Sequence, residues 1–599
     1  MKITRLIIDN FRGVKHANLT FNGDVLFIGS NNVGKSTICE ALDLTLGPDR
    51  LSKFPPIEEF DFYNSVYVEE EKKDLRKIRV EVVLTELSEE ISKRAGGHLE
   101  YWYAKENRIL TTGELALTDD PSSSLCLRME TLGLYNVEED EFEAQTFFSH
   151  SPTQEEGTLQ QVPKAVKRAI GFIYLRTLRT GSRALSLERG SLFDVILRLG
   201  NIKAGLWEET IKTLKNLNPS VDEKAPNLRP LLDALEMRIG QYIPLNPSDK
   251  AASLFVSNLT RENLRKTLSF FLSISPDQVP VPFQEVGTGT LNTLVLALLS
   301  FIAEMKEDVI FAMEEPEIAL PPHSQRRIVN YLIDETSQCF VTSHSPYVIE
   351  MFDPDSIYIL NRKEGALSAS RVVVDGQTIK PKLFKKHARR GLCEVMLGKG
   401  VIVVEGITEQ FVFWSVTKKM EHHNPDFYPV DLSGVTIFST DGDGSMPEYG
   451  MFFQSIGLKT YAFYDFKKDR SVELKEKFSK AFNLNHEISH VGIEALLADE
   501  VPVSRQWQLL QEIRDSGRLD SNPIPKIRPA DGQIKLLTVQ VLKALKGEGT
   551  AGRLIDMCEF AELPSTVTAF VRTIYQAFPK PIIVPVPKFQ PDAQQTLQL

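Results

Sequence analysis

The sequence has 599 residues, of which 42% are hydrophobic and 25% are charged, with a formal net charge of −11. This length predicts two to four domains, and the composition is ordinary for a soluble globular protein. The longest clean apolar run, Leu294 to Ala303, covers about half a membrane span, so we expect no membrane partner.

The cysteines and the start of the chain bear on the compartment. The five cysteines are scattered without paired metal spacing, which favours a reduced, cytoplasmic localisation. Residues Met1–Arg5 have strand-like sequence and no signal pattern. The acidic net charge argues against a surface coated with nucleic acid, but a local basic surface can still bind DNA. The densest basic stretch, Lys380 to Arg390, is either such a surface or a solvated linker.

A phosphate-binding loop follows the first apolar strands. The run Val25–Ile28 leads into Gly29–Thr37 (GSNNVGKST) and then into a helical pattern. In the motif G-x-x-x-x-G-K-[ST], backbone N–H groups wrap the phosphates, the lysine contacts the terminal phosphates and the hydroxyl binds Mg²⁺. The helix N-terminus adds its dipole. We therefore expect ATP and Mg²⁺ at a set of loop residues: Gly29, Asn32, Gly34, Lys35, Ser36 and Thr37.

A second group of ATPase elements lies far downstream. The apolar strand from Val309 ends in two carboxylates. Placed beside the P-loop strand, it would deliver Glu314 to the Mg²⁺ shell and Glu315 to a water that attacks the terminal phosphate. Upstream, a glycine and hydroxyl turn with Gly287 and Gly289 opens an apolar helix, and downstream another strand ends at His344.

This ordered set resembles the motifs of ABC-type ATPases. The resemblance implies that the turn with Gly287 and Gly289 in one subunit contacts the nucleotide of its partner. It also implies that His344 senses the terminal phosphate. We therefore expect a homodimer or a higher even-numbered homo-oligomer.

The last third opens with a second acidic strand end. The strand from Gly400 ends at Glu405-Gly406, and Glu409 follows at the start of a helix. This pattern resembles the opening of a Toprim domain. Glu405 can bind Mg²⁺ or act as a general base, and Glu409 lies one helical turn further, where it can face the same site. Another strand, Thr460–Tyr464, ends in Asp465.

The sequence departs from the Toprim pattern after that strand. Such a site normally presents D-x-D, but this chain has Asp465-Phe466-Lys467, which puts a full two-metal site in doubt. Two replacements for the missing acid remain open. Asp469 lies two residues beyond Lys467, and Asp441 and Asp443 follow a neighbouring predicted strand.

Two residues further downstream complete the candidate nuclease site. Glu494 matches a further acidic helix position of such nucleases, and Lys546 offers a cation that could stabilise the phosphate or the leaving group. A glutamate on a helix and a lysine before a glycine are usually surface residues, which is the competing interpretation of both.

The expected fold class is α/β: an ABC-type P-loop ATPase with a helical insertion, followed by a C-terminal Toprim domain. The insertion shows helical apolar spacing and is interpreted as a dimerisation arm. We expect the ATPase to consist of two parts, residues 1–159 and 274–379, separated by the insertion at residues 160–273. A basic linker at residues 380–395 and the Toprim domain at residues 396–599 follow.

The whole chain resembles the OLD (overcoming lysogenization defect) family of ATP-dependent nucleases, a family that includes the nuclease subunit of the Gabija anti-phage system. Three further runs carry the resemblance: Asn10-Phe11-Arg12, Glu314–Glu317 and Val404-Glu405-Gly406. It implies a DNA endonuclease that uses Mg²⁺ or Mn²⁺, ATP control of DNA access, a defence role and a possible helicase-like partner.

A different class of function stays open. Lys467 in place of an acid favours a DNA-binding ATPase clamp or scaffold, in repair or defence, whose Toprim domain does not cleave. Primase or topoisomerase activity is a weaker alternative, because no sequence setting marks a nucleophilic tyrosine. The leading hypothesis assigns metal-holding and catalytic roles to two sets of residues. They are Glu405, Glu409, Asp465, Asp469, Glu494 and Lys546 for DNA, and Ser36, Glu314 and Glu315 for ATP.

Overall fold

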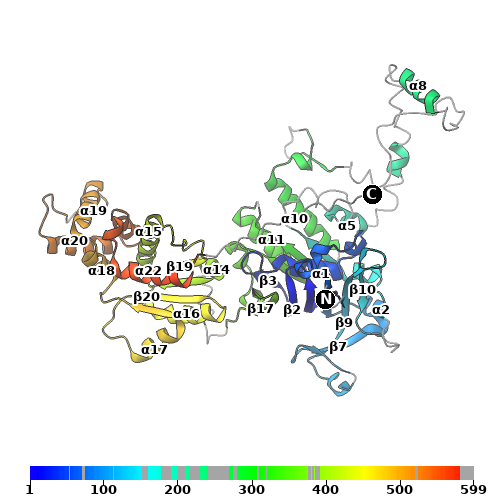
Figure 1. Ribbon diagram of the computed structural model, residues 1–599, viewed down its shortest axis with the longest axis horizontal. Helices are drawn as coiled ribbons and strands as arrows, with labels where there is room; N and C mark the ends of the chain where they lie inside the picture. Colours follow the sequence, from blue (N-terminus) through cyan, green and yellow to red (C-terminus); the bar gives the residue numbers. More distant parts are fainter. Residues whose placement is uncertain are drawn as a thin grey trace, which may run out of the picture. The chain divides into compact units, whose positions relative to one another are not determined.

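The protein forms two compact units, Met1–Val372 and Val373–Leu599 (Figure 1). The computed structural model describes a defined set of residues: 1–52, 54–69, 74–111, 113–151, 159–176, 191–199, 209–214, 229–239, 269–273, 279–305, 309–318, 320–374, 379–380, 384, 391–519 and 524–580. Most of the predicted helical insertion and of the predicted basic linker therefore lies outside the described residues. No helix in the described ranges is long and apolar enough to cross a membrane.

A 13-stranded sheet forms the centre of the first unit. Its strand order is β11-β14-β15-β3-β16-β17-β2-β1-β6-β9-β7-β8, with β10 paired to β9. The strands have these bounds: β1 Lys2–Phe11, β2 Val14–Thr20, β3 Val25–Ile28, β6 Ile78–Thr85, β7 Leu99–Tyr103, β8 Arg108–Ile109, β9 Ser123–Asn136, β10 Glu141–Phe148, β11 Phe172–Leu175, β14 Ile310–Glu314, β15 Gln338–Thr342, β16 Ile357–Lys363 and β17 Ala366–Arg371. Two short hairpins, β4 (Val68–Glu69) with β5 (Asp74–Leu75) and β12 (Phe271–Leu272) with β13 (Val281–Pro282), stand apart from it.

The five strands β11, β14, β15, β3 and β16 run parallel. Every residue of β3, β14 and β15 is buried, as the continuous apolar sequence of a parallel strand requires. The P-loop helix α1 (Lys35–Leu46) contacts β6, β11 and β14, and α10 (Thr288–Met305) packs beside α11 (Pro322–Glu335) (Figure 1). The shorter helices are α2 Glu89–Ala95, α3 Lys164–Ile170, α5 Leu192–Leu199, α8 Arg229–Ile239 and α12 Pro346–Ile349.

Two expectations about this unit need correction. The acidic strand β14 does not lie beside the P-loop strand β3, because β15 lies between them. The predicted insertion cannot begin at residue 160, because α3 and β11 belong to the ATPase core and β11 is the outermost strand of the sheet. Phe172–Leu175 (FIYL) pairs in parallel with β14, and this short apolar run was obscured by the helical patterns that surround it.

The second unit contains a four-stranded parallel sheet in the order β19-β18-β20-β21. Helices α15 and α16 cover opposite faces of it (Figure 1). The strands and helices have these bounds: β18 Gly400–Val404, β19 Val435–Ser439, β20 Lys459–Tyr464, β21 Leu484–Glu487, α14 Cys393–Met396, α15 Ile407–His423, α16 Met446–Ser455, α17 Val472–Ala481, α18 Ile493–Glu500, α19 Val503–Ser516, α20 Asp531–Ala544, α21 Thr550–Asp556 and α22 Ser565–Ala577. The expected α/β class is confirmed.

The boundary between the units differs from the predicted linker. The second unit begins at Val373, and Leu392 and Cys393 are already buried in it. The described end of the predicted 380–395 linker is therefore packed structure. Its basic residues Lys382, Lys385, Lys386, Arg389 and Arg390 lie outside the described residues.

Gln338 connects the parallel and antiparallel halves of the first unit. This fully buried side chain accepts from Ile3 N–H at 2.7 Å and donates to the carbonyls of Ile3 at 3.1 Å and Gly23 at 2.6 Å. Gln338→Ala leaves these backbone groups without partners, so we expect the first unit to lose about 2–4 kcal/mol of stability. Calorimetric unfolding measures the loss, and the exposed helix residue Asn330 provides the control Asn330→Ala. A melting temperature unchanged by Gln338→Ala would contradict this role.

Candidate functional site

The loop Gly29–Thr37 has the backbone shape of a phosphate cradle. Gly29, Asn32 and Gly34 have φ values of 150°, 63° and 124°, which lie in the region that favours glycine and tolerates asparagine. A Cβ on Gly29 would lie 3.0 Å from the carbonyl oxygen of Leu360. The loop therefore approaches β16 as closely as a glycine allows.

Lys35 folds back over this loop. Its Nζ donates to the carbonyls of Gly29 at 2.8 Å and Ser30 at 3.0 Å. Burial lowers the pKa of Lys35 to about 8, and the charges of Glu315 and Glu317 oppose the shift. The two hydrogen bonds of the buried Lys35 ammonium group go to uncharged carbonyls, so its positive charge can attract an anion such as a phosphate.

The two predicted Mg²⁺ residues of the ATPase lie against each other. Glu314 is buried at the end of β14, and the Ser36 side chain lies close enough to lower the pKa of its carboxyl, against the effect of burial. Tyr174 Oη, at the end of β11, donates to Glu314 Oε1 at 2.6 Å. Burial raises the pKa of Glu314. The register pairs Glu314 with Thr342 and Thr342 with Phe27, so two strand spacings, about 10 Å, separate β14 from β3.

Glu315 and His344 face the same loop. Burial lowers the pKa of His344, the charge of Lys35 adds to the effect, and Glu315 opposes it. Glu315 thus lies within electrostatic reach of both Lys35 and His344. Its N–H donates to the carbonyl of Thr342 at 2.8 Å, and its φ of 45° marks a constrained turn after β14.

Glu317 is a contributor that sequence reasoning did not single out. Its carboxylate accepts from Ser343 Oγ at 2.9 Å and from the His344 N–H at 2.7 Å. It therefore fixes the turn that presents His344. The sequence signal was available in the run Glu314–Glu317, whose third acid had no assigned role.

The remaining predicted ATPase residues are placed as follows. Thr37 is buried in the first turn of α1. Gly287 and Gly289 are exposed at the start of α10, with open space where a Cβ would lie. Within the described residues of one chain, nothing brings these two glycines to the P-loop.

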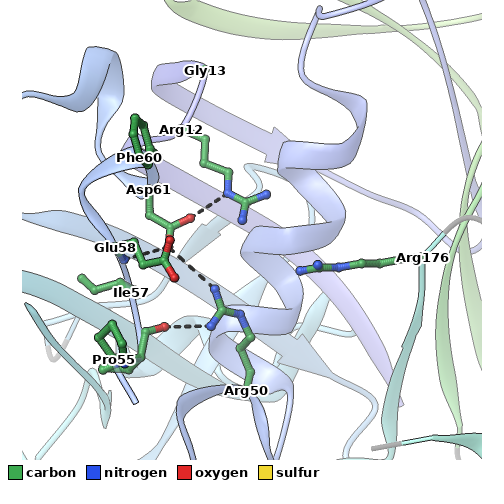
Figure 2. A pocket seen from close by; sticks show the side chains of 10 residues that line it. Arg12, Gly13, Arg50, Pro55, Ile57, Glu58, Phe60, Asp61 and Arg176 are labelled. Atoms are coloured by element: carbon green, nitrogen blue, oxygen red, sulfur yellow. Dashed lines mark hydrogen bonds and ion pairs between the residues drawn. The ribbon is translucent and has the colours of Figure 1, made fainter. Parts of the chain in front are cut away.

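A pocket of about 520 Å³ lies beside α1 (Figure 2). Arg12 and Arg176 approach the buried Glu40 of α1, with ion-pair distances of 3.2 Å and 2.6 Å. Arg12 also pairs with Asp61 at 2.8 Å, while Arg50 donates to the carbonyl of Pro56 at 2.7 Å. Of the charged residues around this pocket, the sequence analysis had singled out Arg12 alone. Glu40, an acid among the apolar residues of α1, was the sequence signal that could have indicated the rest.

The Toprim unit gathers acids at the carboxyl ends of neighbouring strands. Glu405 follows β18 and Asp465 follows β20, and these strands pair in parallel. The Asp465 N–H donates to Glu405 Oε1 at 2.9 Å. The two residues on which the predicted metal site depends are therefore in direct contact.

Glu409, Glu494 and Lys546 converge on this pair, and two glycines show where. A Cβ on Gly406 would lie 3.0 Å from Glu409 Oε2 and 3.9 Å from Lys546 Cε. A Cβ on Gly492 would lie 2.8 Å from Glu494 Oε2 and 3.8 Å from Asp465 Oδ2. Side chains larger than hydrogen would displace the carboxylates.

The electrostatics confirm how closely the carboxylates approach one another. Burial raises the pKa of Asp465 to about 7, with further increases from Glu405, Glu409 and Glu494 and a decrease from Lys546. Burial is also the main cause of the raised pKa values of Glu405 and Glu409. Lys546 lowers the pKa values of Glu409 and Asp465, and Lys467 and Arg470 lower that of Glu405, but burial outweighs them. A divalent cation would favour the charged form of all these carboxylates.

The orphaned oxygen atoms fit a cation as well. Glu409 Oε2 and Glu494 Oε1 are buried and have no hydrogen-bond partner, although buried carboxylate oxygens normally have one. No three His, Cys, Asp or Glu side chains in the described ranges are arranged to hold a metal ion as they stand. Binding therefore requires the carboxylates to rotate towards a shared point.

Asp469, one candidate for the missing second acid, is exposed after β20, and its metal role stays a prediction. Asp443 approaches instead, since its charge raises the pKa of Glu405. Asp443 itself pairs with Lys467 at 2.6 Å and with Arg470 at 3.3 Å. Of the two replacements left open by the sequence, the neighbouring strand supplies the nearer acid.

Comparisons with known proteins agree with this architecture. The profile of the AAA ATPase domain matches residues 1–349, and that of the TOPRIM domain of overcoming lysogenization defect protein-like proteins matches residues 396–466. Old nuclease of Escherichia phage P2 is 22% identical over 41% of this chain and 44% of its own length. Endonuclease GajA of Bacillus cereus (strain VD045) is 21% identical over 74% of this chain and 71% of its own. The chain thus matches less than half the length of the first relative.

Among solved structures, an SMC head bound to the C-winged-helix domain of ScpA covers 63% of this chain and 99% of its own, at 11% identity and a TM-score of 0.34. Fold and sites define a P-loop ATPase of the ABC type joined to a Toprim domain. The chain belongs to the AAA ATPase domain family, and residues 396–466 of its second unit match the TOPRIM domain of overcoming lysogenization defect protein-like proteins.

The raised pKa of Asp465 gives a pH dependence. Between pH 3.8 and about 7 the folded unit keeps a proton that the unfolded chain has lost, so this group's contribution to stability is lost as pH rises through about 7. Asp465→Asn removes the ionisation. We expect its melting temperature to exceed that of the wild type at pH 5 and by a larger margin at pH 8, in buffer with EDTA, because the unfolded wild type has already lost this proton at pH 5. The exposed Asp469→Asn is the control, and an equal difference at both pH values would contradict the assignment.

Proposed function

We propose that the protein is an ATP-binding, metal-dependent DNA endonuclease whose ATPase state gates the Toprim site, acting in defence against phage DNA. The observation that carries the proposal is the cluster of Glu405, Glu409, Asp465 and Glu494 with two buried, unpartnered oxygen atoms. The nuclease relatives Old and GajA support the reaction class. The defence role and a helicase-like partner rest on the family resemblance and stay predictions.

The roles of the residues follow from their positions. Glu405, Glu409, Asp465 and Glu494 would hold Mg²⁺ or Mn²⁺, which supplies an activated water and neutralises phosphate charge when bound. Asp465 must lose its proton to take part. Lys546, on the Glu409 side of the cluster, can stabilise charge on the phosphate or the leaving oxygen. Asp469 is too exposed to share a buried ion with them and is the least supported of the metal residues.

In the nucleotide cycle, Lys35 releases the loop carbonyls and turns to the phosphates. Ser36 and Glu314 would hold Mg²⁺, and Glu315, near His344, would polarise the attacking water. The exposed Gly287 and Gly289 are available to a second copy of the chain. A homodimer that sandwiches two nucleotides would therefore complete each site, and higher even-numbered assemblies follow from repeating it.

A second function is favoured by one observation. Lys467 occupies the position of an acid and pairs with Asp443 at 2.6 Å, which lowers the negative charge available for metals. If this pair persists on DNA, the protein would be an ATP-dependent clamp or scaffold on DNA that does not cleave.

Cleavage of supercoiled plasmid separates the two functions. With Mg²⁺ or Mn²⁺ we expect nicked or linear products from the wild type and a loss of at least about 100-fold in rate from Glu405→Gln, since the variant keeps the Asp465 contact but loses the charge. Asp469→Asn is the matched acidic control and should cut nearly normally. Binding without cleavage under all metal conditions would favour the clamp.

The ATPase assignment has its own test. Lys35→Ala should abolish ATP hydrolysis because the terminal phosphates lose their cation. Glu315→Gln should keep ATP bound and trap dimers, measurable by light scattering with ATP. Normal turnover in Lys35→Ala would overturn the site, and unchanged assembly and turnover in Glu315→Gln would remove Glu315 as the base.

A further inference from the structure

Two cations hold Asp443, and they differ in kind. Arg470 is completely buried, lies 4.6 Å over the ring of Tyr464 and 5.2 Å over that of Phe478, and pairs with Glu487 at 3.3 Å as well as with Asp443. Its Nη2 also donates to the Asp465 carbonyl at 2.8 Å. Arg470 is thus a fixed part of the strand ends.

Lys467, unlike the buried Arg470, lies largely in solvent. Its side chain is 51% exposed, yet it makes the shorter contact, 2.6 Å from Nζ to Asp443 Oδ1. An exposed lysine pair gains little net stability because water competes for the ammonium group. Lys467 can therefore leave Asp443 at small cost, whereas Arg470 cannot.

Asp443 lies close enough to the acidic cluster to matter there. Its charge raises the pKa of Glu405, and Lys467 and Arg470 act in the opposite direction on the same carboxyl. Asp443 lies after β19, which pairs with β18, and Glu405 directly follows β18. The backbone joins the two strand ends, because Gly442 N–H donates to the Glu405 carbonyl at 2.8 Å.

We propose that Lys467 is a DNA-phosphate contact that masks Asp443 until DNA binds, so that DNA and the divalent cation bind cooperatively. Negative phosphates at the mouth of the site attract the exposed ammonium group. Once Lys467 turns to a phosphate, Asp443 keeps only Arg470 and adds negative charge beside Glu405. This inference rests on the proposed nuclease site and assigns its substrate-dependent step to the residue that departs from the Toprim pattern.

The test measures Mn²⁺ binding to the full chain without DNA, from the electron paramagnetic resonance signal of free Mn²⁺. Lys467→Met should bind Mn²⁺ at least about fivefold more tightly than the wild type, the size of a modest coupling. The neighbouring exposed lysine gives the matched control, Lys468→Met, which should change affinity less than about twofold. In the background Asp443→Asn, Lys467→Met should have no further effect, because the lysine acts through that carboxylate.

A second experiment measures the affinity of the protein for a labelled DNA duplex by fluorescence anisotropy, once with Ca²⁺ and once with EDTA. The wild type should bind DNA more tightly with the cation, and Lys467→Met should lose this difference, since coupling between two ligands is reciprocal. Equal Mn²⁺ affinity in the wild type and Lys467→Met, or a gain that persists with Asp443→Asn, overturns the mask.

The metal site itself is tested separately. If Glu405→Gln binds Mn²⁺ as well as the wild type does, the cation is held elsewhere, and both the proposed site and the mask fail. If Glu405→Gln loses Mn²⁺ while Lys467→Met behaves like the wild type, only the mask fails.

Discussion

Crowding of like charges at the carboxyl ends of parallel strands is the constraint on which both sites depend. In the Toprim unit, β18 and β20 bring Glu405 and Asp465 into contact, and Glu409 and Glu494 add two more carboxylates. Burial deprives these groups of water, which is why the pKa of Asp465 rises to about 7. Such an arrangement is unfavourable by itself and becomes favourable when a cation or protons occupy it.

In the ATPase unit, hydrogen-bond donors from neighbouring residues stabilise the buried carboxylates. Glu314 receives a hydrogen bond from Tyr174, and Glu317 receives two from the turn at His344. Lys35 is held by neutral carbonyls. The loop therefore presents a buried positive charge, whereas the Toprim cluster presents buried carboxylates. These opposite charges underlie the proposed nucleotide site in one unit and the proposed metal site in the other.

The motifs predicted where these residues lie in the fold, because each stands at or near a strand end or helix start, where local sequence fixes the position; their catalytic and binding roles stay predictions. The strand neighbours were harder to predict: β15 separates β3 from β14, and β11 comes from a segment that was interpreted as helical. Sequence separation explains what was missed. Tyr174 and Glu314 are 140 residues apart, and no periodicity encodes that contact. Likewise, the sequence shows that a lysine stands where an acid is expected, but only the fold shows that Lys467 forms an ion pair with Asp443.

The central claim is that the four carboxylates of the second unit hold a divalent cation. Anomalous diffraction from crystals grown with Mn²⁺ tests it directly. The account predicts a peak within about 2.5 Å of carboxylate oxygens from both Glu405 and Asp465, the ordinary range for such ions. A Mn²⁺ peak elsewhere in the unit, with Glu405 and Asp465 still joined to each other and outside its shell, would contradict it.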